Sequence, residues 1–136
     1  MSNTKLTECL PKNVYEKNYE ILHQICPNIY ERLLAGDIDL SNENHIQLKI
    51  ELLKKQNNYY DITISHNFVE NGDVVPDPEF ILRLYPKYEL VEIVQYQDRF
   101  GIRYVYLPNG KIDPKAKIEL NHYFSTWVSQ INIHEH

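Results

Sequence analysis

The chain is poor in cysteine, glycine and long apolar runs, and each scarcity excludes a class of protein. Only two cysteines, Cys9 and Cys26, occur, and neither belongs to a CxxC pair, so a reducing compartment fits better than a disulfide framework. The four glycines form no phosphate-binding loop. No stretch approaches the roughly 20 apolar residues that span a bilayer, and the N-terminus lacks the apolar core of a signal peptide. We therefore expect a cytoplasmic protein that does not engage a membrane.

Concentrated positive charge is also missing. The formal net charge is −5, and no run of Lys and Arg occurs. Because nucleic-acid binders use a cationic face to displace counterions from phosphates, nucleic acid is disfavoured as a partner. The acidic stretch at 70–79 lacks the spacing of a calcium loop, and the terminal pair His134 and His136 lacks a third fixed ligand. We expect no metal site and no cofactor.

Tyrosine, in contrast, is plentiful. The chain contains 11 Tyr against four Phe and one Trp, and Tyr suits half-wet surfaces because its ring can be buried while its hydroxyl meets water. A chain of 136 residues has the size of one ordinary domain. We expect residues 1–12 to form an irregular N-terminal arm and residues 13–136 to form a single domain.

Periodic apolar residues predict two helical pieces near the N-terminus and one long helix near the C-terminus. The first piece starts at Asn13 and should break near Pro27, which has no amide to donate. The second piece is "PNIYERLLAG". The last helix begins after Asp113, a suitable N-cap, with Pro114 at the first helical position. Its predicted buried face consists of Leu120, Phe124, Trp127, Val128 and Ile131.

Between these helices, alternating apolar residues predict strands. "HIQLKIELL" and "YYDITISHNF" should pair as a hairpin, the second with Asp61, Thr63 and Ser65 outward. "VENGDVVPDPE" is predicted to be a loop because it is rich in Gly, Pro and acids. "FILRLYPKYELVEI" supplies two further strands, and "GIRYVYL" a short fifth. The predicted fold class is α+β, a two-layer arrangement in which an antiparallel meander sheet of four to five strands packs against N-terminal and C-terminal helices.

The hairpin "FILRLYPKYELVEI" carries charge where a purely structural hairpin would place apolar residues. If residues 86–87 form a two-residue turn, Arg83 and Glu92 become diagonal neighbours on one sheet face. A slip of one residue would move Glu92 to the core face. The two charges then form either a solvated cross-strand ion pair or part of a contact surface, in which Tyr85 supplies area and Arg83 an anchor.

Four further polar residues belong to the candidate binding set. Asn18 and Asn121 lie beside the apolar stripes of the first and last helices, and each either hydrogen-bonds backbone or lines a pocket together with Lys117 and Arg103. Cys26, on the apolar stripe, is expected to be a small buried hydrophobe. The full set of candidate binding residues is Arg83, Tyr85, Glu92, Arg103, Lys117, Asn121 and Asn18. None of them is assigned to catalysis.

Three segments carry a resemblance to a known family. They are "YEKNYEILHQICP", "LRLYPKYELVEI" and "RYVYLPNGKIDPKAKIELNHYFSTWV", which together cover most of residues 13–128. In these segments the chain resembles the YqiB-like family of small bacterial proteins, a domain of unknown function. The resemblance implies a bacterial cytosolic protein and no established activity.

Two functional hypotheses follow from these residues. The leading one is a non-catalytic binding or adaptor module that engages another protein through a sheet face bearing Tyr and Arg. The alternative is a small enzyme or ligand-binding protein that recognises an anionic group through Arg83 and Arg103, with Glu92 as a base. The sequence leaves open whether the protein is an enzyme.

Overall fold

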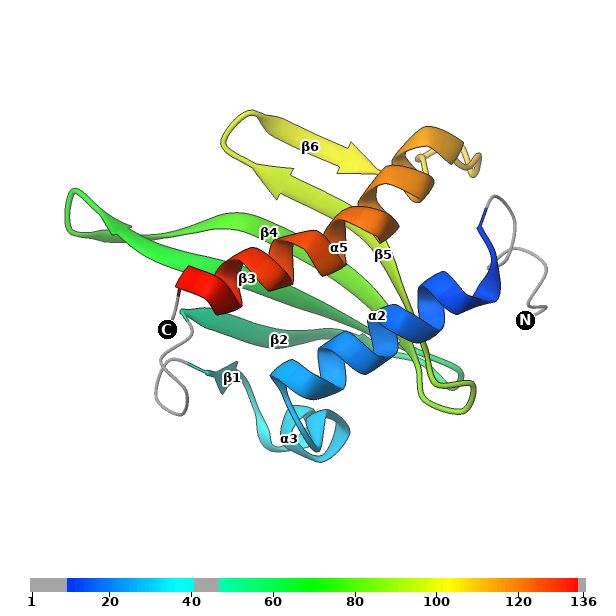
Figure 1. The fold of residues 1–136 in the computed structure, drawn as a ribbon, viewed down its shortest axis with the longest axis horizontal. Helices are drawn as coiled ribbons and strands as arrows, with labels where there is room; N and C mark the ends of the chain where they lie inside the picture. Colours follow the sequence, from blue (N-terminus) through cyan, green and yellow to red (C-terminus); the bar gives the residue numbers. More distant parts are fainter. Residues whose placement is uncertain (1–9, 41–46, 135–136) are drawn as a thin grey trace.

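A computed structural model describes residues 10–40 and 47–134, in which helices pack on one antiparallel sheet (Figure 1). The helices are α2 (Lys12–Ile25), α3 (Ile29–Ala35) and α5 (Pro114–His134). The strands are β1 (Ile38–Asp39), β2 (Leu48–Lys55), β3 (Tyr60–Glu70), β4 (Asp73–Tyr85), β5 (Leu90–Asp98) and β6 (Gly101–Tyr104). They lie in the order β1-β2-β3-β4-β5-β6, each antiparallel to the next. The predicted α+β meander is confirmed, with six strands in the sheet.

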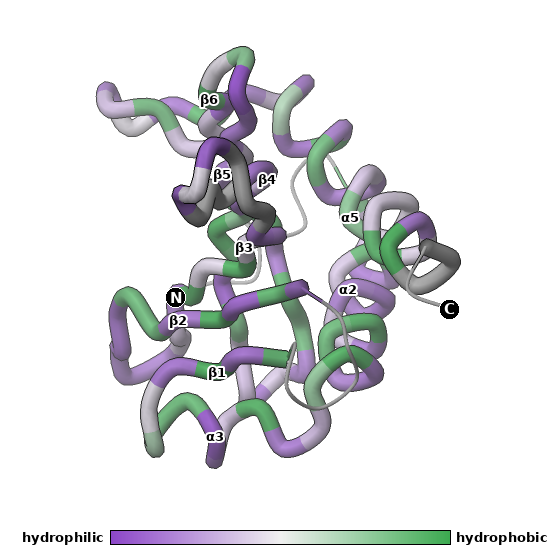
Figure 2. Tube along the Cα trace, turned by 90° about the vertical axis from the view of Figure 1, so that its left-hand side faces the viewer, coloured by the Kyte–Doolittle hydropathy of each residue, from purple (hydrophilic) through white to green (hydrophobic). Residues whose placement is uncertain are grey.

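The sheet has two unlike faces. Seen from its edge, α2 and α5 lie on one side of the strands (Figure 2). We call this side the covered face; it carries Ile50, Ile64, Phe80 and Tyr96 in one cross-strand row. We call the other side the open face. Its rows are Glu51, Thr63, Ile81, Gln95 and Tyr104, and next to it Lys54, Asp61, Arg83 and Glu92.

The covered face builds the main core. All five residues predicted for the inner side of the last helix are buried there. Phe80 lies at the centre, with its ring centroid 4.7 Å from that of Trp127 and 5.6 Å from that of Phe124. Burial of this apolar area supplies the main driving force for folding.

The helix ends follow the local signals in the sequence. α2 stops at Ile25, two residues before Pro27, as predicted. The N-cap of α5 is formed by Asp113, whose carboxylate accepts a hydrogen bond of 3.1 Å from the Ala116 amide. Because this cap sets where α5 begins, it also sets which of its side chains reach the sheet.

The largest error in the predicted fold concerns the stretch "VENGDVVPDPE", which was expected to be a loop. β3 and β4 run through it and form one long hairpin closed by Asn71 and Gly72, whose φ angles are 54° and 84°. Asn-Gly is a strong signal for a two-residue hairpin turn with positive φ at both positions. The abundance of acids and prolines in the stretch concealed that signal.

The predicted register of the next hairpin is also corrected. Its turn spans four residues, 86–89, instead of two, and Tyr85 pairs with Leu90. Arg83 therefore lies directly opposite Glu92 and not diagonal to it. The register moved by two residues, and because side chains alternate with a period of two, both charges still share the open face as predicted.

Some predictions fall outside the residues that the structure describes. These concern most of the N-terminal arm, Cys9, Ile46 of the first predicted strand, and His136. Within residues 10–40 and 47–134, no helix combines the length and apolarity needed to cross a membrane.

Candidate functional site

Three charged side chains from three adjacent strands lie in one row on the open face. The register aligns Asp61 of β3 with Arg83 of β4, and Arg83 with Glu92 of β5. A cation between two carboxylates can pair with either. The row therefore forms the starting point of the candidate site.

Arg83 pairs with Asp61. Its Nε and Nη2 atoms donate to the two carboxylate oxygens at 2.8 and 3.1 Å, a bidentate arrangement that fixes the guanidinium in position. The guanidinium carbon lies 4.3 Å from the ring centroid of Tyr59 and 5.8 Å from that of Tyr106. About 24% of the Arg83 side chain remains accessible, so one charged group of the row still reaches solvent.

Glu92 is paired with Lys117, a residue of α5. Both side chains are 0% exposed, and Lys117 Nζ lies 3.3 Å from Glu92 Oε2. The Tyr106 hydroxyl donates to the same oxygen at 2.6 Å and accepts a hydrogen bond from Lys117 at 3.3 Å. The other carboxylate oxygen, Oε1, is buried with no hydrogen-bond partner among the described residues. We call Glu92, Tyr106 and Lys117 the buried triad.

Burial dominates the electrostatics of the triad. Loss of hydration raises the pKa of Glu92, and the positive charge of Lys117 together with the Tyr106 hydrogen bond only partly offsets this effect. Burial and the neighbouring negative charge of Glu92 likewise raise the pKa of Tyr106. The carboxylate and the ammonium group neutralise each other, so the triad adds no net charge to the interior.

Lys117 reaches the open face around the edge of β5. β6 pairs only with residues 95–98 of β5, so the first half of β5 has no strand beyond it. Two asparagines take the place of that strand. The Asn121 side chain accepts from the Ile93 amide at 2.8 Å and donates to the Ile93 carbonyl at 3.2 Å, while Asn18 donates to the Val91 carbonyl and to Asn121, both at 3.2 Å. Buried backbone groups need such partners.

A hollow of about 420 Å³ lies on the open face above Arg83. Its apolar floor includes Ile81 and Val94, and Tyr106 connects it to the buried triad. Its full lining is Leu53, Lys54, Asp61, Ile81, Arg83, Val94, Gln95, Tyr104 and Tyr106. A concave, largely apolar surface with a fixed cation is the usual form of a binding site.

Residues 17–135 match the family model described as a domain of unknown function, DUF6908. The chain belongs to this family. No curated protein and no solved structure shows significant similarity to the chain. Of the resemblance inferred from the sequence, a domain of unknown function is confirmed, whereas the match carries no YqiB name.

Within this DUF6908 domain, the seven candidate residues lie in four places. Arg83 borders the open-face hollow, with Glu92 and Lys117 buried beside it. Tyr85 is also buried, packed in a small cluster with Leu10, Tyr15 and Leu90. The expectation that Tyr85 supplies accessible contact area is therefore wrong, because Tyr15 of α2 packs against it, just as Lys117 of α5 covers Glu92.

Asn18 and Asn121 do line a pocket together, a small hollow of about 220 Å³ between α2 and α5. Neither Lys117 nor Arg103 is among its lining residues. Both amide groups are engaged with the β5 edge and with each other. The predicted hydrogen bonds to backbone are confirmed by these contacts, and a binding role for the two residues stays a prediction.

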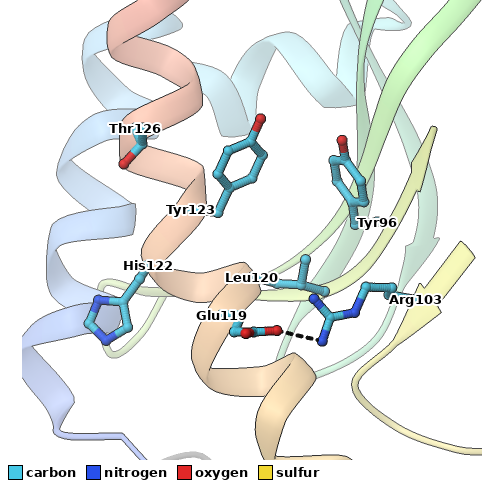
Figure 3. A pocket seen from close by; sticks show the side chains of 7 residues that line it. All are labelled: Tyr96, Arg103, Glu119, Leu120, His122, Tyr123 and Thr126. Carbon is cyan, nitrogen blue, oxygen red and sulfur yellow. Dashed lines mark ion pairs between the residues drawn. The ribbon is translucent and has the colours of Figure 1, made fainter. Parts of the chain in front are cut away.

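Arg103 lies on the covered side of the sheet, because it pairs across the strands with Tyr96. There it faces α5 and forms an ion pair of 2.9 Å with Glu119 (Figure 3). Arg83 and Arg103 therefore belong to opposite faces. They cannot bind one small anionic group together. The predicted recognition of such a group by both arginines is therefore wrong.

Sequence reasoning missed the partners of the charged residues. Asp61 was expected to point outward without a role, and Tyr106 entered only through the family resemblance. A hairpin turn at Asn71-Gly72 would have paired the strands of Asp61 and Arg83 without fixing which residues face each other. Nothing local indicates that Lys117 reaches Glu92. Within the described residues, no group of three or more His, Cys, Asp and Glu side chains is arranged to hold a metal ion.

Proposed function

We propose that this protein is a non-catalytic cytosolic binding module that docks a segment of another protein on the open face of its sheet. The observation that carries the proposal is the hollow above Arg83, on the side of the sheet opposite to the bodies of α2 and α5. Its composition supports a protein partner, because Tyr and Arg are enriched at the cores of protein interfaces.

The fixed guanidinium favours recognition at low entropic cost. Asp61 holds Arg83 through two hydrogen bonds, so little side-chain freedom remains to be lost on binding. The remaining accessible edge of the guanidinium can donate to a carbonyl or carboxylate of the partner. Leu53 and Tyr104, which are 54% and 42% exposed, stand at the rim of the hollow and supply apolar contact.

The groups that would suit acid–base chemistry are withdrawn from this surface. Glu92 and Lys117 are completely buried and paired with each other. A general base must reach the proton that it removes, within hydrogen-bond distance or through one water. The arrangement therefore favours recognition over catalysis at this face.

Site-specific photo-crosslinking in living cells tests the proposal. A benzophenone amino acid is placed at position 53 or 104 on the open face, and at position 34 as the control. Leu34 is 60% exposed on α3 and so presents an equally accessible apolar position away from the hollow. We expect one discrete protein adduct from positions 53 and 104 and none from position 34.

A blocking substitution makes the test specific to the hollow. Tyr104→Asp introduces charge at the exposed rim without touching the core, and it should abolish the adduct formed from position 53. Adducts of equal yield at position 34, no adduct at either open-face position, or an adduct that persists in the Tyr104→Asp variant would each contradict the proposal.

A further inference from the structure

A second cleft, of about 500 Å³, lies on the other side of the sheet between α5 and the β5–β6 hairpin. Figure 3 shows the rings of Tyr96 and Tyr123 beside each other in it, with Leu120 and the Arg103–Glu119 ion pair toward one end. Its remaining lining residues, Glu119, His122 and Thr126, belong to α5. The cleft is thus separate from the open-face hollow.

The walls of the cleft are aromatic and fixed. The Tyr96 and Tyr123 rings lie 5.9 Å apart at 87°, and both contact the buried ring of Phe80, at 5.0 and 6.3 Å. The Tyr96 hydroxyl donates to Asp98 at 3.0 Å, which further holds that ring. Because aromatic rings favour edge-to-face and offset-stacked contacts, the exposed surface of this fixed pair can pack against one further flat ring.

The charged end of the cleft is already arranged for a carboxylate. Arg103 Nη2 binds the Glu119 carboxylate at 2.9 Å, so the protein's own side chain shows which group fits that position. Both side chains are more than two-fifths exposed, 41% and 48%. An exposed ion pair is weak, so a ligand carboxylate can displace Glu119 and take both donors of the guanidinium fork.

We propose that this cleft binds a small aromatic carboxylate, with its carboxylate on Arg103 and its ring packed against the accessible surface of the Tyr96–Tyr123 pair. A monoanion matches the single cation, whereas a more highly charged group would meet the neighbouring negative charge of Glu119. Glu119 then competes with the ligand for Arg103 and lowers the affinity of the cleft for the ligand.

The competition makes two substitutions act in opposite directions. Arg103→Gln removes the charged fork and should weaken binding of 4-hydroxyphenylacetate and indole-3-acetate by roughly tenfold or more. Glu119→Gln removes the competitor and should tighten binding of the same acids severalfold. Both residues are half-exposed, so neither change disturbs the core.

Binding is measured by calorimetric titration of the full chain, with the two acids and their neutral amides as probes. The control variant is Arg99→Gln, which removes another exposed Arg in an ion pair, with Asp77 at 2.9 Å, from the nearby β5–β6 turn. We expect the acids to bind the parent protein, the amides to bind much more weakly, and Arg99→Gln to leave both unchanged.

Several results would overturn the assignment. They are no detectable binding of either acid at millimolar concentration, equal binding of acids and amides, or loss of affinity in Glu119→Gln comparable to that in Arg103→Gln. Because Arg103 and Tyr104 point to opposite faces of the sheet, failure here leaves the crosslinking result on the open face unaffected, and the two proposals fail separately.

Discussion

Adjacent residues of β4 and β5 lie on opposite faces of the sheet, where different interactions hold them. On the covered face, the side chains of Leu82 and Ile93, which pair across the strands, are buried in the apolar core. On the open face, Arg83 and Glu92 pair one position along the same strands, and Glu92 is buried with Lys117. Apolar burial is favourable in proportion to area, whereas a buried charge is tolerated only with its partner.

The difference predicts how each face responds to substitution. The covered face should lose stability with the volume removed, because cavities in a packed core are costly. The charged face should respond to the balance of charge more than to volume. Substitutions in the two regions can therefore be compared on one scale, the free energy of unfolding.

The largest effect is expected from Phe80→Ala. Phe80 is fully buried and contacts four aromatic rings, so its removal leaves a large cavity at the centre of the core. Chemical denaturation should show a loss of about 3–5 kcal/mol. The matched control is Phe100→Ala, which alters a 90% exposed ring and should change stability by less than about 0.5 kcal/mol. Similar losses for the two variants would contradict this description of the core.

A comparable or slightly smaller loss is expected from Lys117→Met, for an electrostatic reason. The change keeps the side-chain volume but leaves Glu92 buried without its counter-ion, which costs about 3–5 kcal/mol when a buried pair is broken. Lys115→Met, at an exposed position of the same helix, is the control.

The double variant Lys117→Met/Glu92→Leu separates charge from packing. Removing both charges should recover most of the stability lost in the single variant, because replacing a whole buried pair by apolar groups is often neutral. A double variant as unstable as Lys117→Met alone would show that volume, and not charge balance, governs this side of the sheet.

A smaller loss is expected from Asn121→Ala at the edge that joins the two faces. The substitution leaves the Ile93 amide and carbonyl buried without their partner, at about 1–3 kcal/mol for each group left unsatisfied. The Ile93 amide, which loses its acceptor in this variant, should also exchange its hydrogen faster. Gln130→Ala, exposed on the same helix, should affect neither quantity.

The smallest effect is a pH dependence confined to the charged face. Because burial raises the pKa of Glu92, the folded state binds more protons than the unfolded state between the ordinary Glu pKa, about 4.5, and the raised value. In that window the free energy of unfolding falls as pH rises, by at most about 1.4 kcal/mol per pH unit. The Glu92→Gln variant should lack this contribution. If the free energy of unfolding changed with pH in the same way in the parent and the variant, the prediction would be refuted.

Much of the fold follows from local patterns in the sequence. The inner face of α5 was predicted residue by residue, because a helix repeats its apolar positions regularly and Trp127 and Phe124 fall on that repeat. The end of α2 before Pro27 and the cap at Asp113 follow from backbone chemistry alone. These features need no knowledge of the rest of the chain.

The charged row shows where local patterns stop being sufficient. Counting back from the Asn71-Gly72 turn without interruption would set Arg83 opposite Tyr60, on the wrong face. The irregularity in pairing between Ser65 and Asn67 shifts the register by one residue, so that Arg83 meets Asp61. The prolines of this stretch indicate that β4 is interrupted, but not where its pairing resumes.

The sequence by itself determined which residues alternate toward each face, because the periods of helices and strands are properties of the backbone. Only the tertiary structure decided which charges meet. Arg83 pairs with Asp61 because the register between β3 and β4 shifts by one residue. Glu92 pairs with Lys117 because α5 crosses the part of β5 that β6 leaves unpaired. A pairing between residues far apart in the chain depends on the positions of whole elements, which no short stretch of sequence encodes.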